Sequence, residues 1–296
     1  MAVRARHERS SRSIVPRVAT ERAATGLTTR TVDELSIQDE RAFRHVPLYA
    51  ALKDALRRDG YVFRVLPRAS ARWNHALLLN LTYWGGGGGD VVESDHVPAD
   101  VIAHAAWHHL AARAVRGSVR AARAASSARP SSEALFFGES IASAFDVYLV
   151  GRLLSVSPRS AFLATQVPAM AAVAHDAGLP AKRFAALLAT MARDPEASFE
   201  SLRELLYDTS LALVAAPAAD DAHAILAHAA AHPFGALLHR YELSNWVLYA
   251  RAYASGAARA AREVTRVRAF DEALRRAGRP LEWLSSALFG PGEHGV

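Results

Sequence analysis

From about residue 98 onwards, apolar positions recur every three or four residues, which is the period of an amphipathic α-helix. Prolines and glycines interrupt this pattern at intervals and mark where one helix ends and the next begins. After residue 130 the interruptions predict eight helices, at 132–154, 158–176, 180–193, 196–215, 219–231, 234–254, 256–277 and 280–288. The pattern therefore predicts a mainly α fold (α+β) that ends in a C-terminal helical bundle.

The first hundred residues predict shorter elements. Residues 47–56 have helical spacing and stop at Gly60, and residues 61–66 form a β-rich run ended by Pro67. Residues 76–84 are a second strand candidate, although so short a segment could also be helical. Five consecutive glycines follow at 85–89, without the Gly-Lys-Ser/Thr that a phosphate-binding loop needs, so we expect a flexible connector there.

Charge and composition restrict the class of protein. The net charge of +6 is concentrated in residues 1–30, where seven arginines face two glutamates, and we expect residues 1–35 to be a disordered basic arm. The arm has no interleaved aromatic residues, so nucleic-acid binding is not expected. With no cysteine, disulfides and thiolate ligands are excluded, and no uncharged apolar stretch reaches 18 residues. We expect a cytoplasmic protein without a membrane span.

The candidate chemistry begins with a pair of histidines in an apolar helix. His104 and His108 are four residues apart in the segment 101–110, so their imidazoles lie on one helical face, one turn apart. The same face carries Val101 and Val115, which indicates that it turns toward the core. Imidazole nitrogens in an apolar setting need a partner, and a metal ion is one solution. His109, one step round the helix, is expected to be solvated.

A carboxylate helix follows about thirty residues later. Phe137, Ile141 and Phe145 make one side of this segment apolar, while Glu139, Ser143 and Asp146 line another side. Glu139 can complete a shell of two histidines and one carboxylate and leave a coordination position open. Ser143 and Asp146 can then orient the ligands by hydrogen bonding to them.

Here the chain resembles a known family. The segment around His104 and His108 looks like the H-E-x-x-H helix of zincin metallopeptidases, and the segment around Glu139 looks like the glutamate helix of their gluzincin branch. The resemblance covers about residues 60–154. It implies a Zn²⁺ site formed by His104, His108 and Glu139, beside a sheet supplied by the preceding strands.

One departure from the family pattern affects the chemistry. The family's general-base glutamate follows the first histidine, and this chain has Ala105 there. A methyl group cannot accept a proton, so ordinary peptide hydrolysis should be lost or severely reduced. Three alternatives remain: a pseudo-peptidase that keeps its metal, an enzyme in which Asp146 or His109 acts as the base, or an oxidative Fe²⁺ site, since two histidines and a carboxylate also suit non-haem iron.

A second group of histidines lies further along the chain. The group comprises His223, His228, His232 and His239, with Glu242 three residues beyond the last. It could form a second metal site or supply a donor for a developing oxyanion opposite the first metal. Pro233 interrupts the group, so we favour partly exposed histidines without a shared role.

These features predict four regions along the chain. They are a basic arm at 1–35, a zincin-like metal-site region at 36–155, a helical bundle at 156–290 and a disordered tail at 291–296. The preferred function is a metal-binding, zincin-like protein with an unknown protein or peptide partner. The alternative is a non-catalytic helical interaction protein that docks through its basic arm. The oligomeric state does not follow from the sequence.

Overall fold

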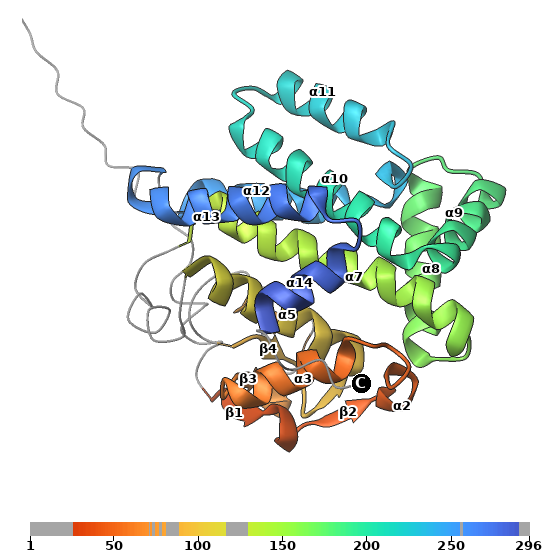
Figure 1. Ribbon diagram of the computed structural model, residues 1–296, viewed down its shortest axis with the longest axis vertical. Coiled ribbons are helices and arrows are strands. Elements are labelled where there is room, and N and C mark those ends of the chain that lie inside the picture. Colours follow the sequence, from red (N-terminus) through yellow and green to blue (C-terminus); the bar gives the residue numbers. More distant parts are fainter. Residues whose placement is uncertain are drawn as a thin grey trace, which may run out of the picture.

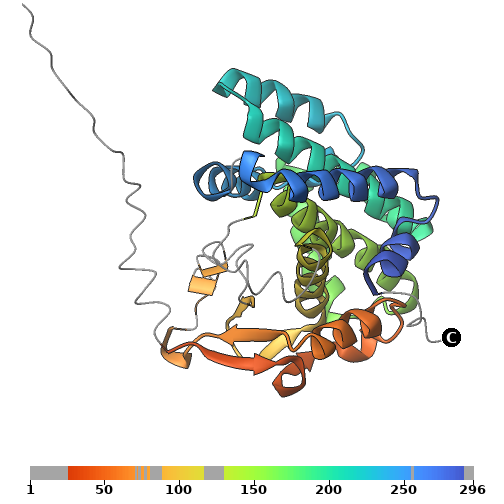
Figure 2. The same cartoon turned by 60° about the vertical axis from the view of Figure 1, so that its left-hand side comes forward.

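The protein is described here from a computed structural model. The structure describes residues 26–70, 72, 75–76, 79–80, 89–116, 130–254 and 257–289. Within these ranges the fold is mainly α, as predicted, with a few short strands near the N-terminal end. Figure 2 shows the strands at one end of the molecule and helices α10 (Pro195–Ala215) and α11 (Ala219–Ala230) at the other.

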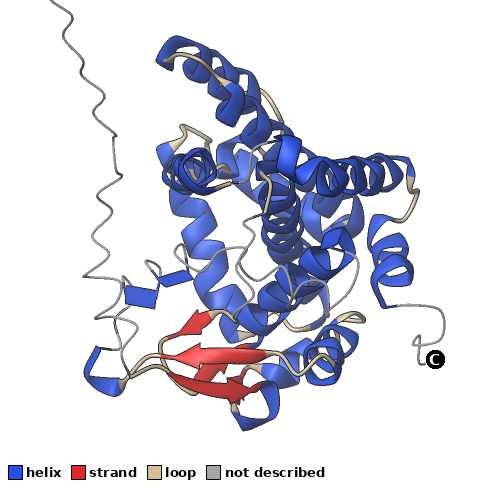
Figure 3. Ribbon diagram, turned by 90° about the vertical axis from the view of Figure 1, so that its left-hand side faces the viewer, coloured by secondary structure: helices blue, strands red, loops and turns tan. Residues whose placement is uncertain are grey.

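The strands form two small sheets, drawn in red in Figure 3. In the first, β3 (Val62–Val65) pairs antiparallel with β1 (Thr28–Thr31) and parallel with β4 (Val91–Val92). In the second, β2 (Ser36–Gln38) runs parallel to β5 (His96–Pro98). The strand expected at 61–66 is therefore confirmed as β3.

Short helices connect the strands and cover the sheets. The two regular ones are α2 (Glu40–Phe43) and α3 (Tyr49–Arg58), and the latter confirms the helix expected at 47–56. Single 3₁₀ turns lie at Val32–Glu34 and Arg68–Ser70. Leu52, Ala55 and Leu56 of α3 are fully buried, so this helix packs its apolar stripe onto the core and onto α5.

Two expectations for the N-terminal part are wrong or incomplete. The strand expected at 76–84 is not one in its described residues, because residues 75–76 and 79–80 are helical. In this segment the Asn80 side chain bonds to the backbone of Val91. The arm expected at 1–35 includes β1, so the folded chain has already begun by Thr28, while residues 1–25 lie outside the described residues.

The glycine run ends in a position that only glycine can occupy. Residues 85–88 lie outside the described residues, but a Cβ on Gly89 would stand 1.6 Å from the carbonyl oxygen of Val62. The close approach lets β4 pair with β3, and the Arg64 guanidinium donates to the Gly89 carbonyl at 2.9 Å. The expected connector therefore ends against β3.

Two long helices form the centre of the molecule (Figure 1). They are α5 (Ala99–Arg116), which carries the histidine pair, and α7 (Ser132–Val156), which carries Glu139. Helix α7 packs most extensively against α10 and then against α5. It is long and apolar enough to cross a membrane, but 83% of its apolar window is buried inside the protein. That burial is typical of a core helix.

Seven further helices follow α7. They are α8 (Ala161–Asp176), α9 (Ala181–Arg193), α10, α11, α12 (Arg240–Tyr253), α13 (Ala257–Arg276) and α14 (Pro280–Phe289). Most bounds agree with the predicted ones to within about three residues. The exception is the helix expected at 234–254, which begins at Arg240 because Gly235–Leu237 form a separate 3₁₀ turn after Pro233. One hydrophobic core runs from Val32 to Phe289 and is continuous across residue 155.

Candidate metal site

The histidine pair lies on the face of α5 that turns toward α7. Ala103, Ala106 and Trp107, beside the histidines, are fully buried, which fixes the rotation of the helix. The His104 and His108 rings are 4.7 Å apart between centroids and their side chains are 31% and 22% exposed. The four-residue spacing therefore places the two imidazoles side by side, and both are partly exposed.

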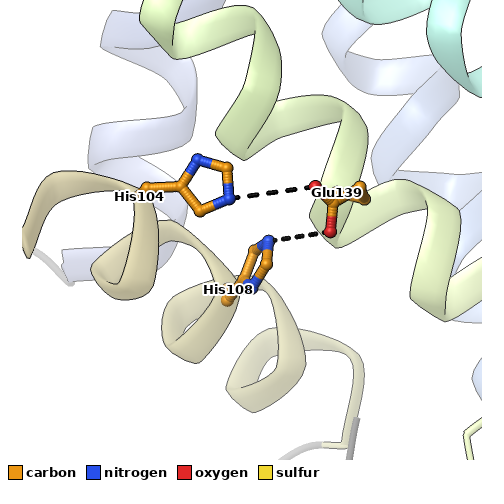
Figure 4. Close-up of side chains that lie close together, drawn as sticks. All are labelled: His104, His108 and Glu139. Carbon is orange, nitrogen blue, oxygen red and sulfur yellow. Dashed lines mark ion pairs between the residues drawn. The ribbon is translucent and has the colours of Figure 1, made fainter. Parts of the chain in front are cut away.

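Glu139 on α7 meets both imidazoles (Figure 4). Its Oε1 lies 3.8 Å from His104 Nε2 and its Oε2 lies 3.1 Å from His108 Nε2. One ligand atom from each residue can be chosen so that all three lie within 4.8 Å of one another. Two ligands of one zinc ion lie about 4 Å apart at most, so these atoms need to close by less than about 1 Å. His104, His108 and Glu139 could therefore hold one metal ion.

The nitrogen of His108 supports this assignment. His108 Nε2 is buried and makes no hydrogen bond, although Glu139 Oε2 is only 3.1 Å away, because the two groups are not aligned for one. A buried nitrogen without a partner costs free energy unless a ligand supplies one. A cation between the imidazole and the carboxylate would satisfy both groups.

Two polar residues of α7 contact Glu139 and His104. The Ser143 hydroxyl donates to Glu139 Oε1 at 3.3 Å, and Asp146 Oδ2 lies 3.7 Å from His104 Nδ1, which is the ring nitrogen that faces away from Glu139. Ser143 and Asp146 therefore stand where residues that orient the ligands are expected.

The carboxylates around the pair shift its protonation. Burial alone would lower the pKa of His104, but Asp146 and Glu139 outweigh it and raise the pKa to about 9. Burial would likewise raise the pKa of Glu139, but His108 and His104 hold it below its ordinary value. Burial and the charge of Asp146 raise the pKa of Asp100, one turn before His104, to about 6. At neutral pH and without a metal, Glu139 is therefore ionised and the imidazole of His104 is protonated.

A pocket of about 520 Å³ opens over the three residues. Ala105 lines it as well and presents only a methyl group to the pocket. On the far side α12 contributes His239 and Glu242. Burial is the main cause that raises the pKa of Glu242; His239 counteracts it, and the charge of Glu139 adds to it.

Glu242 reaches this pocket without a local signal in the sequence. It lies in the first turn of α12, where the Glu242 amide donates to His239 Nδ1 at 3.4 Å. A carboxylate in the first turn of a helix is common, and its position alone does not indicate a site. Only the packing of α12 over α7 and α10 brings Glu242 to the pocket.

His109 lies away from the pocket. Its Nε2 is 2.6 Å from Asp59 Oδ2, the same oxygen that Arg113 contacts, and its side chain is 18% exposed. The expectation that His109 is solvated is therefore wrong. Its partner comes from the end of α3, fifty residues earlier in the chain, and such a contact leaves no local signal in the sequence.

The second group of histidines does not come together. His223 and His228 are exposed on α11, while His232 Nδ1 accepts a hydrogen bond from the Phe234 amide. Among the described residues, the three-residue group around Glu139 is the one metal-type cluster found, so the second metal site considered for this segment is not formed. Of these histidines, His239 lines the pocket.

Comparison of the chain with models of protein families, with curated proteins and with solved structures finds no match in any of the three. The function therefore has to be inferred from the geometry of the site.

Proposed function

We propose that the protein binds one Zn²⁺ ion through His104, His108 and Glu139, in an arrangement like that of the gluzincin metallopeptidases. The observation that carries the proposal is the convergence of three ligand atoms from two separate helices to within 4.8 Å. His108 Nε2 supports it as well, because this buried nitrogen makes no hydrogen bond and lies 3.1 Å from Glu139 Oε2.

Zinc is the preferred ion because the H-x-x-x-H spacing with a downstream glutamate resembles the zincin pattern. Two imidazoles and one carboxylate also suit Fe²⁺, which is the alternative occupant. A bound zinc ion would act as a Lewis acid in the pocket. The chain's own contribution is to fix the ligands, with Ser143 holding Glu139 and Asp146 beside His104.

The protein is proposed to be a pseudo-peptidase, or a metalloenzyme with altered chemistry. The support is Ala105, which lines the pocket at the position of the family's general base and cannot accept a proton. Asp146 is a poor substitute because it lies beside His104 Nδ1, on the side of the ring away from Glu139. His109 is held by Asp59 outside the pocket.

A cytoplasmic location is part of the proposal, supported by the buried α7 and the cysteine-free composition.

Metal analysis of the untagged protein tests the proposal. After incubation with zinc and removal of loosely bound metal, the wild type should retain about one equivalent, whereas His104→Ala should lose most of it because a ligand is missing. His228→Ala is the matched control, since His228 is an exposed histidine on α11. Zinc-free wild type, or a His104→Ala protein that binds as tightly as wild type, would contradict the metal site.

A further inference from the structure

The pocket over the candidate metal site is strongly acidic. Four carboxylates line it, together with three imidazoles, and no lysine or arginine appears among the described lining residues. The four are Asp90, Glu139, Asp146 and Glu242. A divalent ion at the histidine pair would offset two of these negative charges, so negative charge remains for a ligand to neutralise.

Three of the four carboxylates already have a partner, including Asp146, whose Oδ2 lies 3.7 Å from His104 Nδ1. Glu139 is committed to the histidines, and Asp90 accepts a hydrogen bond from the Tyr61 hydroxyl at 3.0 Å. Glu242 forms no ion pair with any lysine or arginine in the described part of the chain. Burial is the main cause that raises the pKa of Glu242; His239 and His104 lower it, while the charges of Glu139 and Asp146 raise it further. A cation beside Glu242 would pair with its carboxylate.

Most of the remaining wall is apolar, and its uncharged polar side chains are Asn80, Ser143, Gln166 and Asn245. Side chains from three helices line it, namely Met170 of α8, Leu202 and Leu206 of α10, and Leu243 of α12. Glu242 lines the same pocket as this apolar wall. A volume of about 520 Å³ is in the range of sites that enclose one small molecule.

An extended peptide finds no free strand edge at this pocket. The β4 carbonyls of Asp90 and Val92 bond to β3, which leaves the main-chain groups of Val91 facing outward. Asn80 occupies both of them: its Oδ1 accepts from the Val91 amide at 2.7 Å and its Nδ2 donates to the Val91 carbonyl at 2.9 Å. The outer edge of β4 is therefore closed at Val91, and adding a peptide strand there would break both bonds.

We propose that the pocket binds a small amphipathic amine, with its ammonium group held by Glu242 and its apolar body against the wall formed by α8, α10 and α12. The inference rests on the proposed function in that it uses the same pocket. The side chains that would bind the amine, however, are those of the protein itself, so binding does not require the metal.

Calorimetric titration with L-leucinamide tests the inference, because this probe joins a primary ammonium to an apolar side chain. Binding should weaken about tenfold or more in Glu242→Gln, which keeps the shape of the side chain and removes its charge. N-acetyl-leucinamide, which lacks the cation, should bind at least about tenfold more weakly than leucinamide. Glu272→Gln, at an exposed glutamate of α13, is the control and should bind as wild type.

The titration is run on zinc-loaded and zinc-free protein, with metal content measured on the same samples. Absence of zinc contradicts the proposed function alone, since the ammonium preference is expected in both forms. The inference is overturned if leucinamide does not bind, if the acetylated probe binds as tightly, or if Glu242→Gln binds as wild type. A blocked extended peptide, such as N-acetyl-tetraalanine amide, that binds more tightly than leucinamide would also overturn it.

Discussion

At the scale of single residues, the histidine pair and Glu139 could be predicted because their signals are local. A four-residue spacing on a helix places two side chains on one face in any fold, and a polar stripe on an apolar helix marks Glu139. Glu242 could not be predicted as a pocket residue, since α12 reaches the pocket only through tertiary packing. The environment of His109 depends in the same way on Asp59, which is distant in sequence.

Substitution of Ala105 tests whether the site hydrolyses peptide-like substrates once a general base is present. Ala105→Glu restores a proton acceptor beside the candidate metal site, and general-base catalysis contributes roughly 10²- to 10⁴-fold. Hydrolysis of leucine p-nitroanilide by the zinc-loaded variant should therefore rise by about 10²-fold or more over wild type. Ala105→Gln, of equal size but unable to accept a proton, is the control. A zinc-loaded Ala105→Glu protein no more active than Ala105→Gln would contradict a zincin-like arrangement.

At the scale of elements, the helix periodicity predicted most of the C-terminal half because each helix buries an apolar stripe between proline or glycine breaks. Ser160 shows how a local cap moves a boundary: its hydroxyl accepts from the Leu163 amide at 3.3 Å, so α8 begins at Ala161 and not at 158. For the segment 76–84 both strand and helix were left open, because a short apolar run carries no periodicity that separates the two, and its described residues are helical.

Helix α7 approaches its neighbours closely enough to require a glycine. A Cβ on Gly151 would lie 2.2 Å from the carbonyl oxygen of Met191 at the end of α9, whereas a Cβ on Gly138 would meet only Ala111 at 3.7 Å. Neither glycine has a positive φ, so the two positions differ in space and not in backbone conformation.

We expect Gly151→Ala to lower the free energy of unfolding by about 1–3 kcal/mol, because backbone must move to admit the methyl group. Gly138→Ala, on the same helix, should leave it unchanged or raise it by up to about 1 kcal/mol through helix propensity. Urea denaturation of the two variants measures the difference. Equal stability of the two variants would show that α7 and α9 leave room for a methyl group at residue 151.

At the scale of the whole molecule, a partly buried charge cluster links α3, α5 and α14. Asp59 at the end of α3 accepts from Arg113 of α5, and the same guanidinium donates to the Leu288 carbonyl of α14. Burial would raise the pKa of Asp59, but the contacts with His109 and Arg113 hold it below its ordinary value. The charged carboxylate therefore stabilises the fold.

Asp59→Asn should lower the free energy of unfolding by about 2 kcal/mol at pH 7, the magnitude of a hydrogen bond to a charged group. Because the folded pKa lies below the unfolded one, this contribution is fully present above the ordinary value of 3.8 and is lost as the pH falls through the folded pKa. Urea denaturation at pH 7 and pH 3 measures both. Asp54→Asn, an exposed carboxylate on the same helix, should change stability by less than about 0.5 kcal/mol. A difference between Asp59→Asn and wild type that stays constant with pH would contradict the ion pair.

The most direct test of the metal site is X-ray absorption at the zinc edge of the zinc-loaded protein. The geometry of His104, His108 and Glu139 predicts nitrogen and oxygen ligands at about 2.0–2.1 Å with the outer-shell scattering of two imidazoles, and of one imidazole in His108→Ala. A wild-type spectrum without two imidazoles, or one that His108→Ala leaves unchanged, would contradict the proposal.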